Sequence, residues 1–145
     1  MHPISLTDEL HIAMQAIEKN MEFDSQLDGT FLNELYDGDA MYAATVFDTF
    51  LQEVGSMMDN CRIAIDGGDI PLFQKAVHKF KPTLSYVGLT DMGKRLENLE
   101  QACSTGASVG ELLATYQQIA NEITGLLPLI KNEKDKLDAI TINTN

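Results

Sequence analysis

The chain of 145 residues is long enough for one domain with a single hydrophobic core, and its 44% hydrophobic content is ordinary for a globular protein. No apolar run approaches the roughly 20 residues that a membrane span needs, and a formal net charge of −12 argues against sequence-independent binding to nucleic acid or an anionic membrane. The chain begins without the features of a signal peptide, and Cys61 and Cys103 both fall on apolar helical stripes, so we expect a cytoplasmic protein with reduced core cysteines.

The first expected element is an N-terminal helix within residues 1–22, which packs on the rest of the protein and has Ser5 or Thr7 as its cap. Its apolar residues recur at helical spacing: Leu10, Met14, Ile17 and Met21. A turn-rich stretch follows, and "FLNELYDGD" then predicts a short helix that stops at Asp37-Gly38.

A long helix is expected next, capped by Asp39 and ended by Gly67-Gly68. Its apolar positions alternate in steps of three and four: Phe47, Phe50, Val54, Met57, Cys61 and Ile65.

The following helix begins after Asp69, has Pro71 in its first turn, where a missing N–H costs nothing, and is closed by Gly88. Its apolar stripe consists of Ile70, Phe73, Val77, Phe80, Leu84 and Val87.

Two more helices complete the pattern, the last of which begins at Ser108 with a capping box to Glu111. The stripe of the first is Met92, Leu96, Leu99 and Cys103, and that of the second is Leu112, Tyr116, Ile119, Ile123, Leu127 and Ile130. Residues 134–145 lack a sustained stripe, so we expect them to fray. Because no strand pattern competes and the connections are short, residues 23–133 are predicted to form an all-α, antiparallel four-helix bundle.

Basic residues gather in one part of this acidic chain. Between residues 70 and 95 there is one acid, Asp91, and five basic residues: Lys75, Lys79, Lys81, Lys94 and Arg95. Exposed helix faces commonly carry lysine, so chance clustering is one explanation. The other is a basic docking surface around His78.

His78 is predicted to point toward solvent. At about 100° per residue it lies well away from the apolar stripe around Val77, and Lys81 and Ser85 fall on the same side of the helix. Lys75 and Lys79 flank the other side. A solvent-facing histidine can be an ordinary surface residue, so geometry alone leaves both interpretations open.

Pro82 follows His78 by four residues. In a continuous helix it removes the hydrogen bond to the His78 carbonyl, at a cost of about 3 kcal/mol. Because the apolar stripe keeps its phase from Phe80 to Leu84, we predict a bent but continuous helix. The alternative is a break near Lys81, with Pro82 starting a new helix.

Several kinds of chemistry have no support in the sequence. There is no Gly-rich phosphate loop for a nucleotide-dependent kinase and no Glu-x-x-His pair for a dinuclear metal bundle. His78 also has no paired nucleophile of the kind a hydrolase needs.

The segment "VHKFKPTLSYVGL" resembles the signature of the histidine-containing phosphotransfer (HPt) domain family, in which the phosphorylated histidine is followed by Lys three residues later and Gly ten residues later. His78, Lys81 and Gly88 occupy these positions. The next helix resembles the family's Leu-x-x-Leu-Glu pattern, with Leu96, Leu99 and Glu100. The resemblance covers about residues 23–133. It departs where Pro82 and Thr83 replace the usual Gly and Ser, as in a His-x-x-Lys-Pro variant.

The resemblance implies a phosphorelay intermediate that accepts and donates a phosphoryl group on His78, with Nε2 as the attacking atom and Lys81 neutralising phosphoryl charge. The implied partner is the receiver domain of a response regulator or hybrid histidine kinase, which itself holds Mg²⁺; this chain is expected to bind no cofactor or metal and to act as a carrier rather than an enzyme. The residues expected on the docking face are Lys75, Lys79, Pro82, Ser85 and Gly88.

Two alternatives remain open at this point. The first is a binding module of the same fold that docks on a receiver or histidine kinase without carrying phosphate. The second is a small metal- or ligand-binding bundle.

Overall fold

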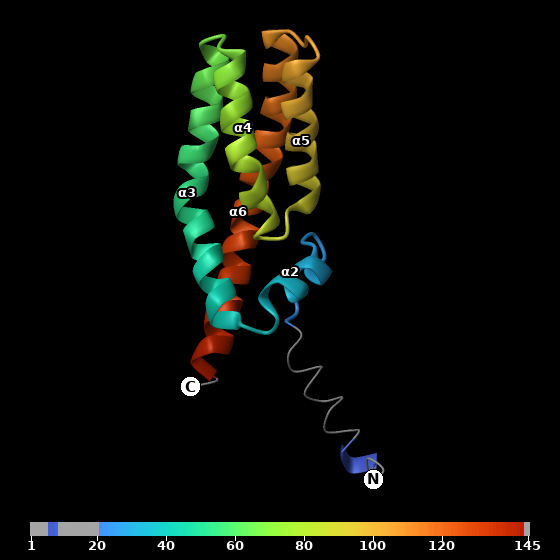
Figure 1. Cartoon of the computed structure of the whole chain (residues 1–145). Helices are drawn as coiled ribbons and strands as arrows, with labels where there is room; N and C mark the ends of the chain where they lie inside the picture. The colour runs from blue at the N-terminus through green and yellow to red at the C-terminus, as the bar shows by residue number, and fades with distance from the viewer. Residues whose placement is uncertain (1–5, 9–20, 144–145) are drawn as a thin grey trace.

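The computed structural model in Figure 1 describes residues 6–8 and 21–143. Residues 6–8 are helical, and Met21 is buried beside α2 (Gly29–Tyr36). The backbone N–H of Met21 donates to the Asn33 side chain (2.7 Å), whose amide donates back to the Met21 carbonyl (2.9 Å). The rest of the expected N-terminal helix, including Leu10, Met14 and Ile17, lies outside the described residues.

Four helices form the body of the molecule: α3 (Ala40–Asp66), α4 (Ile70–Ser85), α5 (Thr90–Ser104) and α6 (Val109–Asn143). α3 packs on α4 and α6, and α5 packs on the same two helices, so the four form a closed ring (Figure 1). The short connections at 67–69, 86–89 and 105–108 reverse the chain each time. The predicted all-α, antiparallel four-helix bundle is therefore confirmed, and residues 6–8 and 21–143 contain no strand.

The predicted caps explain where the helices begin. The carboxylate of Asp39 accepts the backbone N–H of Tyr42 (3.0 Å), and that of Asp69 accepts the N–H of Leu72 (3.0 Å). Ser108 and Glu111 form both halves of the capping box, at 3.1 and 3.4 Å. Each bond satisfies an N–H that the first turn of a helix leaves unpaired.

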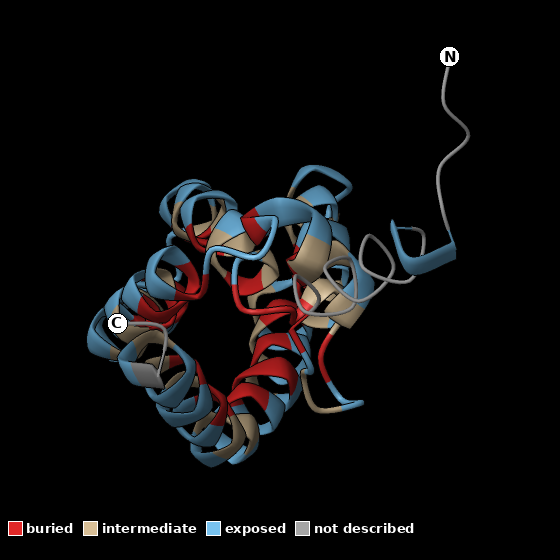
Figure 2. Cartoon of the chain, turned by 90° about the horizontal axis from the view of Figure 1, so that it is seen from below, coloured by how far each residue is buried: buried red, intermediate tan, exposed pale blue. Residues whose placement is uncertain are grey.

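The predicted apolar stripes meet inside the ring of helices, where the buried residues lie in Figure 2. The largest fully buried side chains include Phe47, Phe73, Phe80, Leu96, Tyr116 and Ile123. Ile70, Met57 and Leu127 lie partly buried at the edge of this core.

Both cysteines are unpaired, as expected of core residues. Cys61 is fully buried, and burial raises the pKa of its thiol to about 12. Cys103 is half-buried, its pKa is also raised by burial, and its thiol donates to the Leu99 carbonyl (3.4 Å). Both thiols therefore stay protonated near neutral pH, which agrees with a packing role.

α2 fills the space below the ends of α4 and α5, which are much shorter than α3 and α6 (Figure 1). Asp28 caps α2 through the N–H of Phe31 (3.1 Å), and its own N–H donates to the carbonyl of Gly88 (2.9 Å). The Tyr36 hydroxyl donates to the carbonyl of Tyr86 (2.6 Å). α2 is thus fastened to the loop between α4 and α5.

The expected fraying of residues 134–145 is wrong as far as Asn143, because α6 continues helically to that residue. Ile130, Glu133 and Leu137 lie on one face of α6 and are all buried. The Glu133 carboxylate accepts the backbone N–H of Asp24 (2.7 Å), so a charged residue takes part in the buried stripe. Among the described residues, no helix is both long and apolar enough to cross a membrane.

Candidate functional site

His78 lies on the outer side of α4, as the helical phase predicts. Its side chain is 68% exposed, whereas Val77 and Phe80 on the opposite side are fully buried. An imidazole in this position adds little to packing and is open to a partner molecule.

Pro82 lies inside α4, which runs unbroken from Ile70 to Ser85. The predicted continuity is confirmed, and the alternative of a new helix starting at Pro82 is wrong. Pro82 has no N–H to donate to the His78 carbonyl. The hydroxyl of the next residue, Thr83, donates to the Phe80 carbonyl (2.6 Å), three residues earlier in the same helix.

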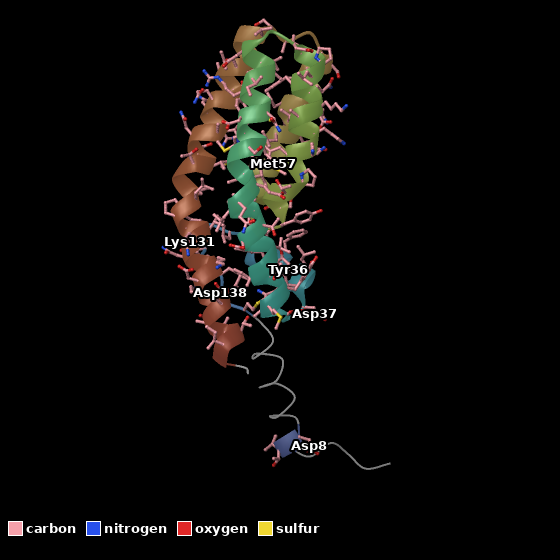
Figure 3. All side chains as sticks on the ribbon, turned by 90° about the vertical axis from the view of Figure 1, so that its left-hand side faces the viewer. Asp8, Tyr36, Asp37, Met57, Lys131 and Asp138 are labelled. Carbon is pink, nitrogen blue, oxygen red and sulfur yellow. The ribbon has the colours of Figure 1, made fainter. Side chains whose placement is uncertain are left out.

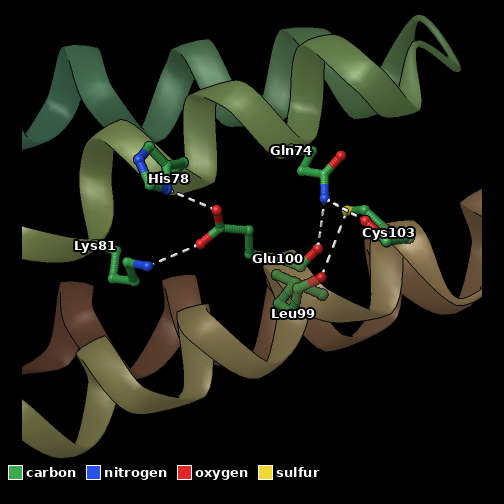
Figure 4. A network of polar contacts seen from close by, with 7 residues as sticks. Gln74, His78, Lys81, Leu99, Glu100 and Cys103 are labelled. Carbon is green, nitrogen blue, oxygen red and sulfur yellow. Dashed lines mark hydrogen bonds and ion pairs between the residues drawn. The ribbon is translucent and has the colours of Figure 1, made fainter.

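Glu100, on α5, connects the two predicted site residues of α4 (Figure 4). Its Oε1 lies 2.6 Å from His78 Nδ1, and its Oε2 accepts a hydrogen bond from Lys81 Nζ (2.9 Å). The Gln74 amide donates to the backbone carbonyl of Glu100 (3.0 Å) and to the Ser104 hydroxyl (2.7 Å). Glu100 is only 19% exposed, so the contact between α4 and α5 fixes its position.

The charge of Glu100 determines which nitrogen of His78 carries the proton. Partial burial raises the pKa of Glu100, but the hydrogen bonds and charges of Lys81 and His78 outweigh this and leave the pKa below its usual value. Glu100 is therefore ionised at neutral pH. An ionised carboxylate only accepts hydrogen bonds, so Nδ1 carries the proton that is donated to it. The lone pair of the neutral ring then lies on Nε2.

Nε2 makes no hydrogen bond to any residue within 6–8 and 21–143. Glu100 thus orients the exposed imidazole of His78 through Nδ1. The basic nitrogen, Nε2, points away from Glu100, the only carboxylate that the ring contacts among the described residues. A neutral imidazole of this kind is a nucleophile, and Lys81 places a positive charge beside it.

The other predicted docking residues separate into two groups. Lys75, Lys79 and Pro82 are exposed on α4, and the two lysines line a shallow groove toward α3 that also contains Ile63. Ser85 is half-buried and lies beside Gly93 of α5.

Gly88 was expected on the docking face; the structure gives it a packing role, and its part in docking stays a prediction. The residue is buried, its φ is +82°, and a Cβ built on it would lie 2.7 Å from Leu32 Cδ1 and 3.1 Å from the Asp28 nitrogen. Gly88 is needed because α2 packs directly against the backbone here.

Glu100 is part of the Leu-x-x-Leu-Glu pattern, but its contacts with His78 and Lys81 could not be predicted from the sequence. It lies 22 residues after His78 on the next helix, so no local spacing links the two. The sequence contained one signal. Leu99 belongs to the predicted apolar stripe of α5 and is buried, so the next residue, Glu100, lies at the border of that stripe, where α5 meets the antiparallel α4.

Metal binding has no support in this geometry, since the described residues contain no group of three or more His, Cys, Asp or Glu that could hold an ion. The second alternative, a metal-binding bundle, therefore gains nothing from the structure.

Comparison with protein families matches residues 45–139 to the model of the Hpt domain, about two thirds of the chain. The matched range contains His78, Lys81 and Glu100, and it begins inside α3, so α2 lies before it. Searches among curated proteins and among solved structures found no match. The family inferred from the resemblance is confirmed, while the His-x-x-Lys-Pro variant stays a prediction.

Proposed function

The chain belongs to the Hpt domain family, and on this premise we propose that His78 accepts a phosphoryl group from the aspartyl phosphate of a receiver domain and donates it to another receiver. Hpt domains are carriers for histidine phosphotransfer in two-component signalling. The observation that carries the proposal is the exposed imidazole whose Nδ1 is held by Glu100 while Nε2 makes no hydrogen bond in the described part of the chain.

In the proposed step, Nε2 of neutral His78 attacks the phosphorus of the acyl phosphate. The N–P bond forms as the P–O bond to the aspartate breaks, and the electron pair of that bond leaves with the aspartate carboxylate. No proton has to move, because the ring keeps its Nδ1 proton throughout. Transfer to the next receiver is the reverse reaction with another aspartate carboxylate as nucleophile.

Glu100 and Lys81 balance the charges that this step creates. The ring gains a positive charge when Nε2 is phosphorylated, and the Glu100 carboxylate, 2.6 Å from Nδ1, stabilises it. The ammonium group of Lys81 donates to Glu100 Oε2 and has further N–H groups that can donate to the phosphoryl oxygens and neutralise their charge. Glu100 therefore also fixes the tautomer in which Nε2 is the nucleophile.

The partner is proposed to be the receiver domain of a response regulator or hybrid histidine kinase. A receiver presents an acidic cluster with Mg²⁺ at its phosphorylated aspartate, and the exposed Lys75 and Lys79 offer it a complementary surface beside His78. The proposal needs no cofactor on this chain, since the energy of the acyl phosphate comes with the partner. Both cysteines are unpaired, which fits the cytoplasm as the proposed compartment.

Incubation with a ³²P-phosphorylated receiver domain tests the proposal. We expect acid-labile, alkali-stable label on the wild-type chain and no label on His78→Gln. The control variant His11→Gln, which removes another histidine of the chain, should still be labelled. His78 is exposed, so His78→Gln should keep a wild-type melting temperature. Label that persists in folded His78→Gln would refute the proposal, and a complete absence of label on the wild type in the presence of bound receiver would favour the non-phosphorylated docking module.

A further inference from the structure

The side chain of Gln74 connects α4 to α5 one turn before His78 (Figure 4). Its amide nitrogen donates to the backbone carbonyl of Glu100 (3.0 Å) and to the Ser104 hydroxyl (2.7 Å). Residues four apart on a helix lie on the same face, so Gln74 and His78 reach α5 from one side of α4. Two adjacent bridges therefore join the helices here, one through the main chain of Glu100 and one through its carboxylate.

These two bridges supply the side-chain hydrogen bonds between α4 and α5, two helices whose residues are all described. The contact of α4 with α3 is different in kind. Figure 3 looks at the side of the molecule on which α3 lies and labels Met57, whose sulfur lies 3.7 Å from the Thr83 hydroxyl of α4. Between α3 and α4, which are also fully described, this is the one polar contact of two side chains. The polar contacts that locate the His78 side of α4 therefore come from α5.

The position of the Glu100 carboxylate depends on the spacing of α4 and α5. The carboxylate has to meet two atoms of α4 at once, His78 Nδ1 (2.6 Å) and Lys81 Nζ (2.9 Å). A shift of α5 by about 1 Å takes either contact out of hydrogen-bond range. On the C-terminal side of His78, the buried Gly93 sets the approach of α5, since a Cβ there would lie 3.5 Å from the Lys81 carbonyl. On the N-terminal side, the bonds of Gln74 do so.

Glutamine suits this place because its amide donates hydrogen bonds without carrying a charge. It holds the main chain of Glu100 and leaves the whole negative charge of the carboxylate to His78 and Lys81. A lysine or arginine at position 74 would instead compete with these two residues for the carboxylate.

From these contacts we infer that Gln74 is a positioning residue for phosphotransfer, an inference that rests on the proposed function of His78. By fixing Glu100, Gln74 keeps the proton of the neutral ring on Nδ1 and leaves Nε2 free to attack. Without the bonds of Gln74 the carboxylate is held less firmly, and rings that carry the proton on Nε2 become more populated. Such rings have no lone pair at the attacking atom, so transfer slows.

The variant Gln74→Met tests the inference, because methionine is unbranched, resembles glutamine in helix propensity and donates no hydrogen bond. Long-range ¹H–¹⁵N spectra of the neutral His78 ring should show a share of the Nε2-protonated form that rises at least about twofold. In single-turnover transfer from a phosphorylated receiver, the saturated rate should fall about two- to tenfold, as the loss of an ordinary hydrogen bond allows. The receiver concentration at half-saturation should stay unchanged, because the exposed Lys75 and Lys79 are intact.

Gln101→Met is the matched control, since Gln101 is exposed and directly follows Glu100 on α5. It should leave the ring spectra and the transfer rate unchanged. A double-mutant cycle tests the route of action: Gln74→Met added to Glu100→Ala should lower the rate no further than Glu100→Ala alone. Gln74→Ala, a second variant without the donor, should reproduce Gln74→Met, and circular dichroism should show all variants folded.

Three results would overturn the inference. The first is an unchanged tautomer or an unchanged saturated rate in folded Gln74→Met, and the second is an equal effect of Gln101→Met. The third is a full additional loss in the Glu100→Ala background, or unfolding of both Gln74 variants, which would leave Gln74 a structural role alone. If the wild-type chain takes no label from a receiver, the proposed function fails, while the ring spectra, which need no receiver, still decide whether Gln74 positions the ring.

Discussion

Replacing Gly88 by alanine tests how the fold holds the end of α4. With φ at +82°, an alanine there costs about 1–2 kcal/mol in backbone conformation alone. Its Cβ would also lie 2.7 Å from Leu32 Cδ1, 3.0 Å from Leu27 Cβ and 3.1 Å from the backbone nitrogen of Asp28. The last contact is with backbone that donates to the Gly88 carbonyl, so it cannot be relieved by a side-chain rotation. Overpacking of this kind adds about 1–3 kcal/mol, which gives a total of about 2–5 kcal/mol.

Gly106→Ala is the matched control, because Gly106 has φ of +88° and nothing within 4 Å of an added Cβ. Urea unfolding of both variants separates the two costs: Gly106→Ala should lose about 1–2 kcal/mol, and Gly88→Ala should lose at least 1 kcal/mol more. Equal losses would refute the close approach of α2 to Gly88.

Further predictions concern the core, the network and the lysines. Phe80→Ala should lower the free energy of unfolding by about 3–5 kcal/mol, because Phe80 is fully buried; near-wild-type stability in urea would mean that the phase of α4 is wrong. Glu100→Gln should lower the free energy of unfolding by about 1 kcal/mol at pH 7, because it removes the charge that pairs with Lys81 and His78. Because the folded pKa of Glu100 lies below its unfolded value, this difference should be full above about pH 4.3 and vanish as the pH falls through the folded pKa; a difference that is the same at acid pH would contradict the ion pairs. In single-turnover transfer, Lys75→Gln/Lys79→Gln should lower the subsaturating rate in a salt-dependent way, and Lys81→Gln should also lower the saturated rate. An unchanged saturated rate for Lys81→Gln would remove its role in transfer.

The helix boundaries could be predicted because the signals that set them are local. Asp39, Asp69 and Ser108 each cap a helix through a backbone N–H three residues later, so short sequence windows contain the whole interaction. The helical phase of α4 could also be predicted from its apolar stripe, and it correctly placed His78 on the solvent side and Phe80 in the core.

The remaining features depend on contacts between distant residues. The apolar stripe of α6 is interrupted in the sequence by Glu133, a charged residue that is not expected in a core. Its burial depends on the backbone N–H of Asp24, which lies 109 residues away in the chain. The Glu100 bridge needs α4 and α5 side by side. From the sequence, Gly88 is a glycine of the family motif, and only the structure shows that α2 packs against it. In each case both residues are in the sequence, but only the folded structure shows that they are in contact.

In the proposed phosphotransfer, Nε2 of His78 carries the phosphoryl group while Nδ1 keeps its proton toward Glu100. Long-range ¹H–¹⁵N correlation spectra of the His78 ring, recorded before and after transfer from a phosphorylated receiver, measure this directly. We expect a protonated Nδ1 in the free chain and phosphorus coupling at Nε2 after transfer. Phosphorus on Nδ1, or a ring that stays unmodified while another residue carries the label, would contradict it.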